Sequence, residues 1–245
     1  MIRSTQNKNV KEWKKLHSKK GRNQSNSFLI EGYHLIEEAY STEQNIKELI
    51  LQEGIENPGW LQDDFVSYVS ESVFNEITQT DTPQGIAAVV AKQSIATKDK
   101  NYVLLLDAIQ DPGNLGTMIR TADAAGFSKI ILGEGTVDLY NDKVIRATQG
   151  SIFHIAIEQG SLTSVIPSLK EQGFSIWGTT LKRAQNYANL SAEGKIALLL
   201  GNEGRGVSQK LLELADQLVK IPIYGRAESL NVGIAAGILM YHLRK

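Results

Sequence analysis

Apolar positions in the first part of the chain follow helical and strand spacings in turn. Val10, Trp13 and Leu16 recur at three-residue steps, which predicts a helix over residues 7–20. Short apolar runs predict strands, and helical patterns lie between them. The strands fall at 28–30, 46–51, 65–69 and 85–90, and the helices at 33–41 and 72–77. This alternation predicts a compact α/β domain over roughly residues 20–91.

The pattern changes after a polar stretch without periodicity. Residues 92–101 are predicted to be a linker. Beyond it come continuous apolar runs of the kind found in strands buried on both faces of a parallel sheet, at 102–106, 129–132, 175–178, 196–200 and 218–223. We therefore expect an N-terminal α/β domain at 1–91, the linker, and a second α/β domain with a mostly parallel sheet at 102–245.

Composition narrows the chemistry. The chain has 245 residues and no cysteine, which excludes disulfides, thiolate zinc sites, iron–sulfur clusters and a cysteine nucleophile. The four histidines show no ligand spacing, so no metal is expected. The N-terminus is polar and basic, and no apolar run has the length that a membrane span needs. A cytoplasmic protein is the default expectation.

The net charge of −1 conceals an asymmetry. Residues 1–23 carry eight basic side chains and one acidic one, a net +7 that leaves −8 for the remainder. A basic arm on an acidic body indicates a polyanionic partner, usually nucleic acid. A solvated amphipathic helix is the alternative for any one lysine. The candidate RNA-contacting residues are Lys8, Lys11, Lys15, Lys19 and Arg22.

Three strand ends carry unusual residues, and ligands of open parallel sheets bind beyond such ends. In the first, Asn114 is a plausible N-cap of the next helix and Gly126 a plausible C-cap. Gly116 and Arg120, four residues apart, share a helix face. On spacing alone this segment reads as a capped helix whose surface arginine could pair with Asp123.

The second strand end, at 201–206, has three glycines beside a carboxylate, which favours a ligand loop over an irregular turn. It matches neither the dinucleotide-binding nor the P-loop pattern. In the third, Ser229 is a plausible N-cap for a helix rich in glycine and alanine. Gly233 and Gly237 in that helix indicate very close packing, since glycine costs about 1 kcal/mol there relative to alanine.

Together the three loops resemble the SpoU–TrmH family of RNA 2′-O-ribose methyltransferases, in the SPOUT superfamily. The family motif Asn-x-Gly-x-x-x-Arg is matched by Asn114, Gly116 and Arg120. Gly-Asn-Glu-Gly-x-Gly is matched by 201–206, and Ser-Leu-Asn-Val by 229–232. The N-terminal part resembles, more loosely, the small ribosomal-protein-like α/β substrate-binding domain of many members, through Phe28, Glu31-Gly32 and the strand order.

The resemblance implies a C-terminal domain tied in a trefoil knot, a homodimer with the active site at the interface, and S-adenosyl-L-methionine as cofactor. Backbone groups of the second and third loops would hold the cofactor. The residues implied for that role are Leu200, Gly201, Asn202, Gly206, Ile221 and Leu230, with Thr179 and Thr180 as weaker candidates. Those implied for catalysis are Arg120, Asn114, Glu203, Ser229 and Asn231.

The resemblance assigns the role of base to Arg120, but a guanidinium stays protonated in proteins. Positioning of an RNA phosphate is the role that its chemistry favours. The extra N-terminal domain favours a large structured target, ribosomal over transfer RNA. The alternatives are a transfer-RNA methyltransferase, a non-catalytic RNA-binding ribosome-assembly factor, and a nucleotide-dependent oxidoreductase, which the missing glycine fingerprint disfavours.

Overall fold

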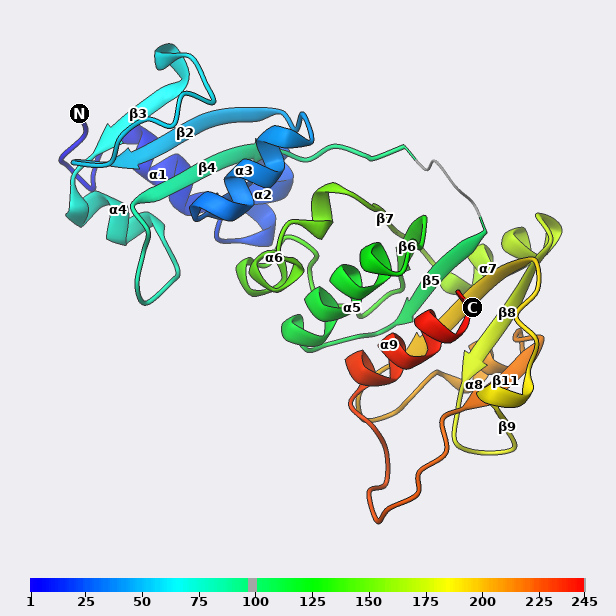
Figure 1. Cartoon of the computed structure of the whole chain (residues 1–245). Helices are drawn as coiled ribbons and strands as arrows, with labels where there is room; N and C mark the ends of the chain where they lie inside the picture. Colours follow the sequence, from blue (N-terminus) through cyan, green and yellow to red (C-terminus); the bar gives the residue numbers. More distant parts are fainter. Residues whose placement is uncertain (97–100, 245) are drawn as a thin grey trace. The chain divides into compact units, whose positions relative to one another are not determined.

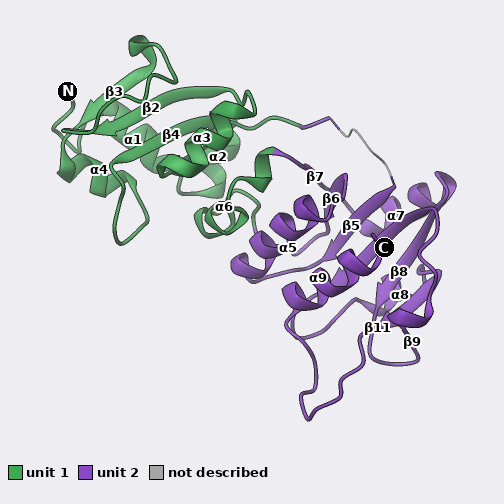
Figure 2. Cartoon of the chain, viewed as in Figure 1, with its two compact units in different colours: residues 1–94, 138–153 green, residues 95–137, 154–245 purple. Residues whose placement is uncertain are grey.

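The computed structural model describes residues 1–96 and 101–244. Contacts divide the chain into two compact units, coloured separately in Figure 2. Unit 1 comprises Met1–Ser94 and Asp138–Phe153, and unit 2 comprises Ile95–Val137 and His154–Lys245. The expected linker falls at the change of unit, and its residues 97–100 lie outside the described residues.

Unit 1 begins with two short helices, α1 (Lys8–Lys15) and α2 (Lys19–Ser25), so the prediction of one helix over 7–20 was wrong. The break has a local cause, because the Ser18 hydroxyl accepts a hydrogen bond from Gly21 N and caps the second helix. A Cβ at Gly21 would lie 2.0 Å from the carbonyl oxygen of Lys15, so only glycine permits this close turn.

The sheet of unit 1 has the order β1-β4-β2-β3, with β4 antiparallel to β1 and β2, and β2 parallel to β3. Helices α1 and α4 supply Val10, Trp13 and Phe74 to a core against one face. The predicted α/β character of this part is confirmed (Figure 1). The elements are β1 (Ser27–Glu31), α3 (Tyr33–Ser41), β2 (Ile46–Gln52), η1 (Asp63–Phe65), β3 (Val66–Val69), α4 (Glu71–Ile77) and β4 (Ile86–Ala91).

A later segment completes unit 1. Residues 138–153, with α6 (Asp142–Thr148) and η2 (Ser151–Phe153), group with it rather than with the sequence on either side. Asp138 forms an ion pair with Arg22, whose side chain is buried. The ring of Phe28 packs on that of Tyr140, with centroids 4.6 Å apart. Unit 1 is therefore discontinuous in sequence.

Unit 2 is built on a seven-stranded sheet of order β7-β6-β5-β10-β8-β11-β9, in which the described pairings are all parallel. This confirms the predicted parallel sheet. The predicted strand at 218–223 ends at Lys220, and the two outer strands were not predicted. The strands are β5 (Tyr102–Asp107), β6 (Lys129–Leu132), β7 (Ala156–Gln159), β8 (Phe174–Thr179), β9 (Gln185–Asn186), β10 (Lys195–Gly201) and β11 (Gln217–Lys220).

Helices cover both faces of this sheet (Figure 1). Helices α7 (Leu162–Glu171) and α8 (Gln209–Leu212) pack on the side to which Val103 and Leu105 point. Helices α5 (Pro112–Ala124) and α9 (Val232–His242) pack against each other, and α9 also contacts β10. A Cβ at Gly233 or Gly237 would meet threonine side chains on α5 at 3.5 and 3.7 Å, which are ordinary van der Waals distances, so the contact with α5 does not by itself require glycine. The short helix η3 (Tyr187–Asn189) follows β9.

Because β5, β10, β8 and β11 are adjacent and parallel, the loops after them leave the sheet at the same edge. We call this the carboxyl edge. Its loops are residues 108–111, 180–184, 202–208 and 221–231. All three strand ends singled out in the sequence therefore meet at one place.

The Arg22–Asp138 pair gives a test of how unit 1 is held together. Asp138→Ala leaves a buried guanidinium without its counterion, and we expect a loss of about 3–5 kcal/mol in the free energy of unfolding. Urea denaturation followed by tryptophan fluorescence measures it. Lys15→Ala, which breaks the exposed pair with Glu12, is the control, with an expected loss below about 1 kcal/mol. Equal losses in the two variants would contradict the assignment.

Candidate functional site

The carboxylate of Glu203 joins the second loop to the first. Its Oε2 accepts a hydrogen bond from Gln110 N at 3.2 Å, and its Oε1 accepts from Asp111 N at 3.0 Å. Oε1 also accepts from Asn114 Nδ2 at 3.2 Å. One side chain thus binds two backbone groups at the start of α5 and one side chain inside it.

Asn114, which donates to Glu203, also binds the third loop. Its Oδ1 accepts from Asn231 Nδ2 at 3.0 Å. Asn231 Oδ1 in turn accepts from Gly233 N at 2.9 Å and Ile234 N at 3.3 Å, which caps α9. The residues predicted at 114, 203 and 231 are therefore brought together in one continuous network across three loops.

Two predicted helix caps were wrong. Asp111, not Asn114, caps α5, because its Oδ1 accepts from Asn114 N at 2.7 Å while Pro112 occupies the first helical turn. Asn231, not Ser229, caps α9. Ser229 lies exposed in the loop and has no part in the network. In both helices a residue other than the predicted one occupies the position just before the first helical turn, and its side-chain oxygen accepts the hydrogen bond from the backbone.

Burial raises the pKa of the Glu203 carboxyl, but hydrogen bonds act more strongly in the other direction. The backbone N–H groups of Asp111, of Glu203 itself and of Gln110, with the Asn114 amide, together hold its pKa below the ordinary 4.5. Glu203 is therefore ionised at neutral pH, and its oxygens are occupied by protein donors. Such a carboxylate is suited to holding loops in place and poorly suited to accepting a proton.

The glycine loop itself is a closed turn. Asn202 Oδ1 accepts from Gly204 N at 3.0 Å and Arg205 N at 3.1 Å, and its Nδ2 donates to Ala108 O at 2.8 Å. A Cβ at Gly201 would lie 2.1 Å from the backbone of Gly206, so this position requires glycine. The protein's own hydrogen bonds and the glycine at 201 thus fix the shape of the loop.

Arg120 lies on α5 with an exposed side chain. In residues 1–96 and 101–244 no hydrogen bond or ion pair involves its guanidinium. The alternative partner Asp123 instead contacts His154 Nδ1 at 2.9 Å. The guanidinium is available to an incoming anion.

The residues implied for cofactor binding line the carboxyl edge. Leu200 and Gly201 are buried, Ile221 is half-buried, and Leu230 is 37% exposed. Within the described chain, the backbone N–H groups of residues 223–230 donate no hydrogen bond to protein. These groups fit a ligand held through the main chain, as expected for S-adenosylmethionine.

The two threonines differ from that group. Thr179 Oγ1 already donates to Leu199 O at 3.0 Å, and Thr180 N donates to Val219 O at 3.1 Å. They tie β8 to its neighbours. Sequence reasoning also missed the backbone groups that bind the second loop: Gln110 N and Asp111 N donate to Glu203, and Ala108 O accepts from Asn202. The Asp-Pro pair at 111–112 was the available signal.

Comparison with known proteins defines the class. A model of the "SpoU rRNA Methylase family" matches residues 101–241, and a model of the "MRM3-like substrate binding domain" matches residues 7–88. These two parts describe an RNA-modifying methyltransferase with its own substrate-binding domain.

Relatives match along the whole length. The 23S rRNA (guanosine(2553)-2′-O)-methyltransferase RlmP of Bacillus subtilis is 48% identical, covering 99% of this chain and 98% of that protein. A solved structure of an AdoMet-bound rRNA methyltransferase from Sinorhizobium meliloti has a TM-score of 0.90 and 34% identity, over 99% of this chain and 96% of that one. A structure described as an RNA 2′-O ribose methyltransferase has a TM-score of 0.83, with 31% identity over 99% and 97% of the two chains.

The chain belongs to the SpoU rRNA Methylase family, as the motifs indicated. It is an S-adenosylmethionine-dependent RNA 2′-O-methyltransferase. The oxidoreductase and non-catalytic alternatives are set aside.

The pKa of Glu203 gives a pH test. A lowered folded-state pKa contributes stability that is present above the ordinary value of 4.5 and is lost as pH falls through the folded pKa. We expect Glu203→Gln to be less stable than wild type by a constant margin above about pH 5, and the margin to narrow at lower pH. Thermal unfolding of both proteins followed by circular dichroism over a range of pH measures it. A margin that widens on acidification would contradict the assignment.

Proposed function

We propose that the enzyme methylates the ribose 2′-OH of a guanosine in 23S rRNA, the one equivalent to the target for which its Bacillus subtilis relative is named. The observation that carries the proposal is the network joining Asn114, Glu203 and Asn231, together with Arg120 on the same helix as Asn114 and without a partner in the described residues. A protein that only bound RNA would not need three loops fixed at the carboxyl edge. Full-length similarity to an enzyme of this specificity supports the choice of RNA.

The cofactor supplies an activated methyl group on a sulfonium, so the protein must align the ribose oxygen and assist loss of its proton. Alignment alone contributes roughly 7–11 kcal/mol in favourable cases. Arg120 binds the phosphate beside the target ribose through its planar fork and stabilises charge that develops on the oxygen. It remains protonated, so it does not act as a simple base.

The other site residues divide by what they touch. Glu203 and Asn231 hold the loops, since their oxygens are engaged with protein donors. The Asn114 amide is engaged in the same way, with Glu203 and Asn231, so it also holds the loops. The hydroxyl of Ser229, which has no partner in the described chain, faces the ribose or its phosphate. The cofactor would be held by the backbone of the second and third loops, at Leu200, Gly201, Asn202, Gly206, Ile221 and Leu230, with Thr179 and Thr180 at the end of the neighbouring strand.

The basic arm of unit 1 binds RNA phosphates. Lys8, Lys11, Lys15 and Lys19 are exposed. Lys11, Lys14 and Lys15 line an open groove of about 340 Å³ beside α1, whose lining also includes Glu76, the ion-pair partner of Lys14. Arg22 is removed from this set, because its buried guanidinium is bound to Asp138 and to two backbone carbonyls. Positive sequence charge alone did not reveal that burial.

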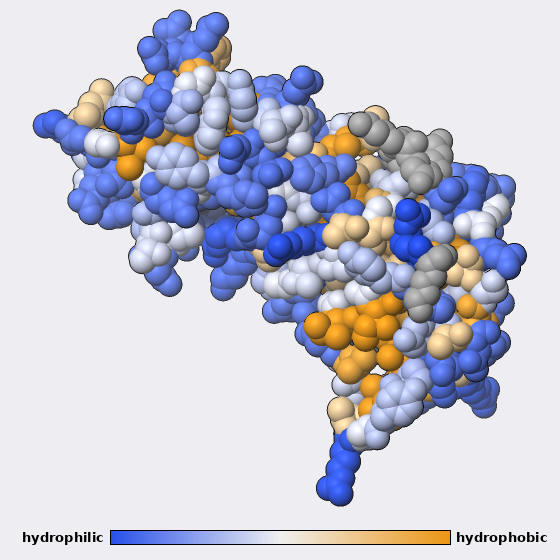
Figure 3. Space-filling view, viewed as in Figure 1, coloured by the Kyte–Doolittle hydropathy of each residue, from blue (hydrophilic) through white to orange (hydrophobic). Residues whose placement is uncertain are grey.

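The enzyme acts as a homodimer through α9. Large apolar side chains on α9 and just before it are exposed: Leu230 by 37%, Ile234 by 57% and Tyr241 by 55%. Figure 3 shows a broad apolar patch over this helix. Patches of this kind mark association surfaces. The interface lies beside the cofactor loops, in line with an active site shared between subunits.

The cytoplasm is the place of action, since its substrate is found there. In the described parts of the chain, every helix is too short or too polar to cross a bilayer. In the same residues no group of three or more histidine, aspartate or glutamate side chains is arranged to hold a metal ion.

The proposed function is tested by mapping 2′-O-methyl groups in ribosomal and transfer RNA from cells with and without the gene, and by assay of purified protein on 23S rRNA. We expect one guanosine in 23S rRNA to lose its methyl group. Arg120→Lys keeps the charge but not the fork, and we expect turnover to fall by about 10²–10³-fold with little change in cofactor affinity.

Arg244→Lys is the matched control, because Arg244 lies over the ring of Tyr102 at 4.8 Å, a contact that lysine can also make. Its turnover should stay near that of wild type. If cells without the gene instead lose a methyl group from transfer RNA, the substrate is transfer RNA and the proposal of 23S rRNA is wrong. Near-full turnover of Arg120→Lys would remove Arg120 from the mechanism.

The dimer has its own test. Ile234→Asp places a charge twice in a symmetric interface, and we expect dimer affinity to fall at least about 100-fold, together with activity. Sedimentation velocity measures the oligomeric state. Leu181→Asp, at a side chain 53% exposed and outside α9, is the control and should remain dimeric. An Ile234→Asp protein that sediments like wild type would refute the α9 interface.

A further inference from the structure

Basic side chains gather at the carboxyl edge of unit 2, on three separate loops. Lys182 and Arg183 follow β8, Arg205 lies in the glycine loop, and Arg226 lies in the loop between β11 and α9. All four are exposed, and within residues 1–96 and 101–244 none of their charged groups has a hydrogen bond or ion pair. Neither the charge asymmetry of the sequence nor the family motifs pointed to them.

The acidic groups of the same edge form no ion pairs with these cations in the described chain, and the oxygens of most of them accept hydrogen bonds from neutral protein donors. Glu203 is bound to the first loop, Asp107 accepts from Ser208 N at 2.8 Å, and Asp111 caps α5. Glu228 is the exception, since it is exposed without a partner in the described chain. The basic side chains of this edge are therefore left free to contact an anionic ligand.

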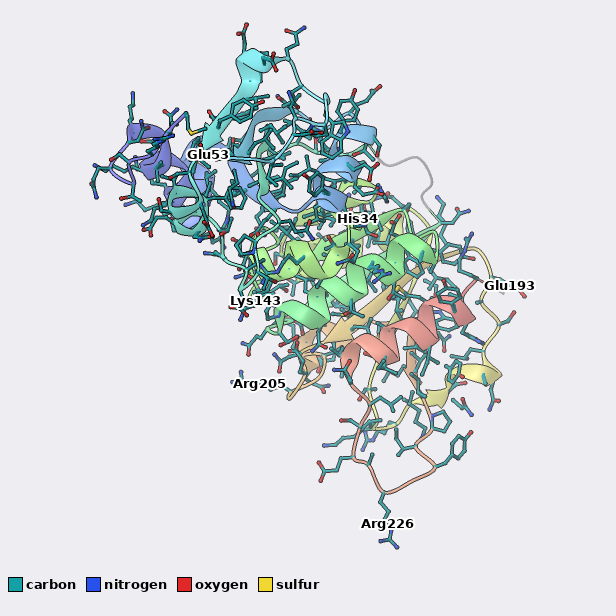
Figure 4. The ribbon with its side chains drawn as sticks, turned by 60° about the vertical axis from the view of Figure 1, so that its left-hand side comes forward. His34, Glu53, Lys143, Glu193, Arg205 and Arg226 are labelled. Carbon is teal, nitrogen blue, oxygen red and sulfur yellow. The ribbon has the colours of Figure 1, made fainter. Side chains whose placement is uncertain are left out.

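The arginines are also well placed by the backbone. Asn202 accepts a hydrogen bond from Arg205 N, so Arg205 projects from a closed turn. In Figure 4, Arg226 extends outward from the far end of its loop, while Arg205 lies on a different loop nearer to the sheet. The two cations are thus presented from separate points along the same edge.

An aromatic side chain accompanies them. Tyr224, two residues before Arg226, is 93% exposed, far more than Tyr241 at 55% or Tyr68 at 37%. Its ring makes no aromatic contact in the described chain. A ring almost wholly in water beside unpaired cations is the combination that binds single-stranded nucleic acid, where bases stack on aromatics and basic groups follow the backbone.

We propose that Lys182, Arg183, Arg205, Arg226 and Tyr224 form a second RNA-binding surface, separate from the lysines of unit 1, which takes an unpaired RNA segment flanking the target nucleotide. The basic side chains bind phosphates, and Tyr224 stacks on a base next to the target. An unpaired segment is specified because a base must leave its helical stack before its face can meet a side chain. The inference rests on the proposed RNA substrate and adds the structural state in which it is bound.

The test uses the full-length protein and a fluorescent single-stranded oligoribonucleotide of about twelve nucleotides, with a duplex of equal length for comparison. Fluorescence anisotropy gives affinity at several salt concentrations. For Arg205→Ala with Arg226→Ala, we expect weaker binding and a log–log salt slope smaller by about 1.4, since each lost contact to a single strand removes about 0.7. Wild type should prefer the single strand.

Tyr224→Ala should weaken binding of the single strand by about 5–150-fold without changing the salt slope, because it removes stacking and not charge. Tyr224→Trp keeps a stacking ring and should restore affinity. The matched control is Lys195→Ala, which removes a positive charge at the start of β10, on the opposite edge of the sheet. It should leave both affinity and slope unchanged.

Unchanged binding by the arginine and tyrosine variants would overturn the proposal, as would equal losses for duplex and single strand. Conversion of a Tyr224→Ala dimer to monomer, seen by sedimentation, would also overturn it and assign the ring to a subunit contact. The binding assay needs no methyl transfer. Failure of the wild-type protein to methylate 23S rRNA would therefore refute the proposed substrate and leave this surface to be judged on its own result.

Discussion

The site depends on one carboxylate that is fully engaged by the protein. Glu203 sits at the end of a buried strand and accepts hydrogen bonds from two backbone groups and one amide at the start of α5. A charged acceptor is needed here because it draws three donors to one point, which a neutral side chain does less strongly. Through Asn114 and Asn231 the same constraint reaches the cap of α9. Three loops distant in sequence thus take one fixed arrangement.

This arrangement separates two kinds of charge at the carboxyl edge. The acidic side chains bind the backbone: the carboxylates of Asp107, Asp111 and Glu203 accept hydrogen bonds from N–H groups of loops and helix starts. Basic side chains such as Arg120 and Arg205 keep no partner in the described chain and face solvent. The carboxylates hold the loops in place, and the exposed basic side chains remain free to bind a polyanionic substrate. Because the loops are already held, little reorganisation is needed when the substrate binds.

The sequence predicted most of this scaffold, for identifiable reasons. The strands that carry the site are continuous apolar runs, such as Leu104–Leu106, because they are buried on both faces. Strand β7 was missed since most of its residues are partly or fully exposed, and β9 since it has two residues. Motif spacing located Asn114, Glu203 and Asn231, but not which of them cap helices, because several side chains near each helix start are chemically able to do so. The knot and the dimer stay predictions.

What the sequence could not show was partnership between distant segments. The amphipathic pattern of α6 indicates that one face is buried, but not that the face belongs to unit 1. Charge counting placed Arg22 with the lysines predicted to contact RNA, although its partner Asp138 lies far along the chain. The same count overlooked Arg205 and Arg226, since the sequence around them is balanced by acids. The hydrogen bonds show that Glu203, beside Arg205, is engaged by protein donors, whereas Glu228, beside Arg226, has no partner in the described chain. Counting charges along the sequence therefore includes a buried arginine among the candidates for RNA binding and leaves out exposed ones. The exposure and pairing of each charged side chain are the better guide.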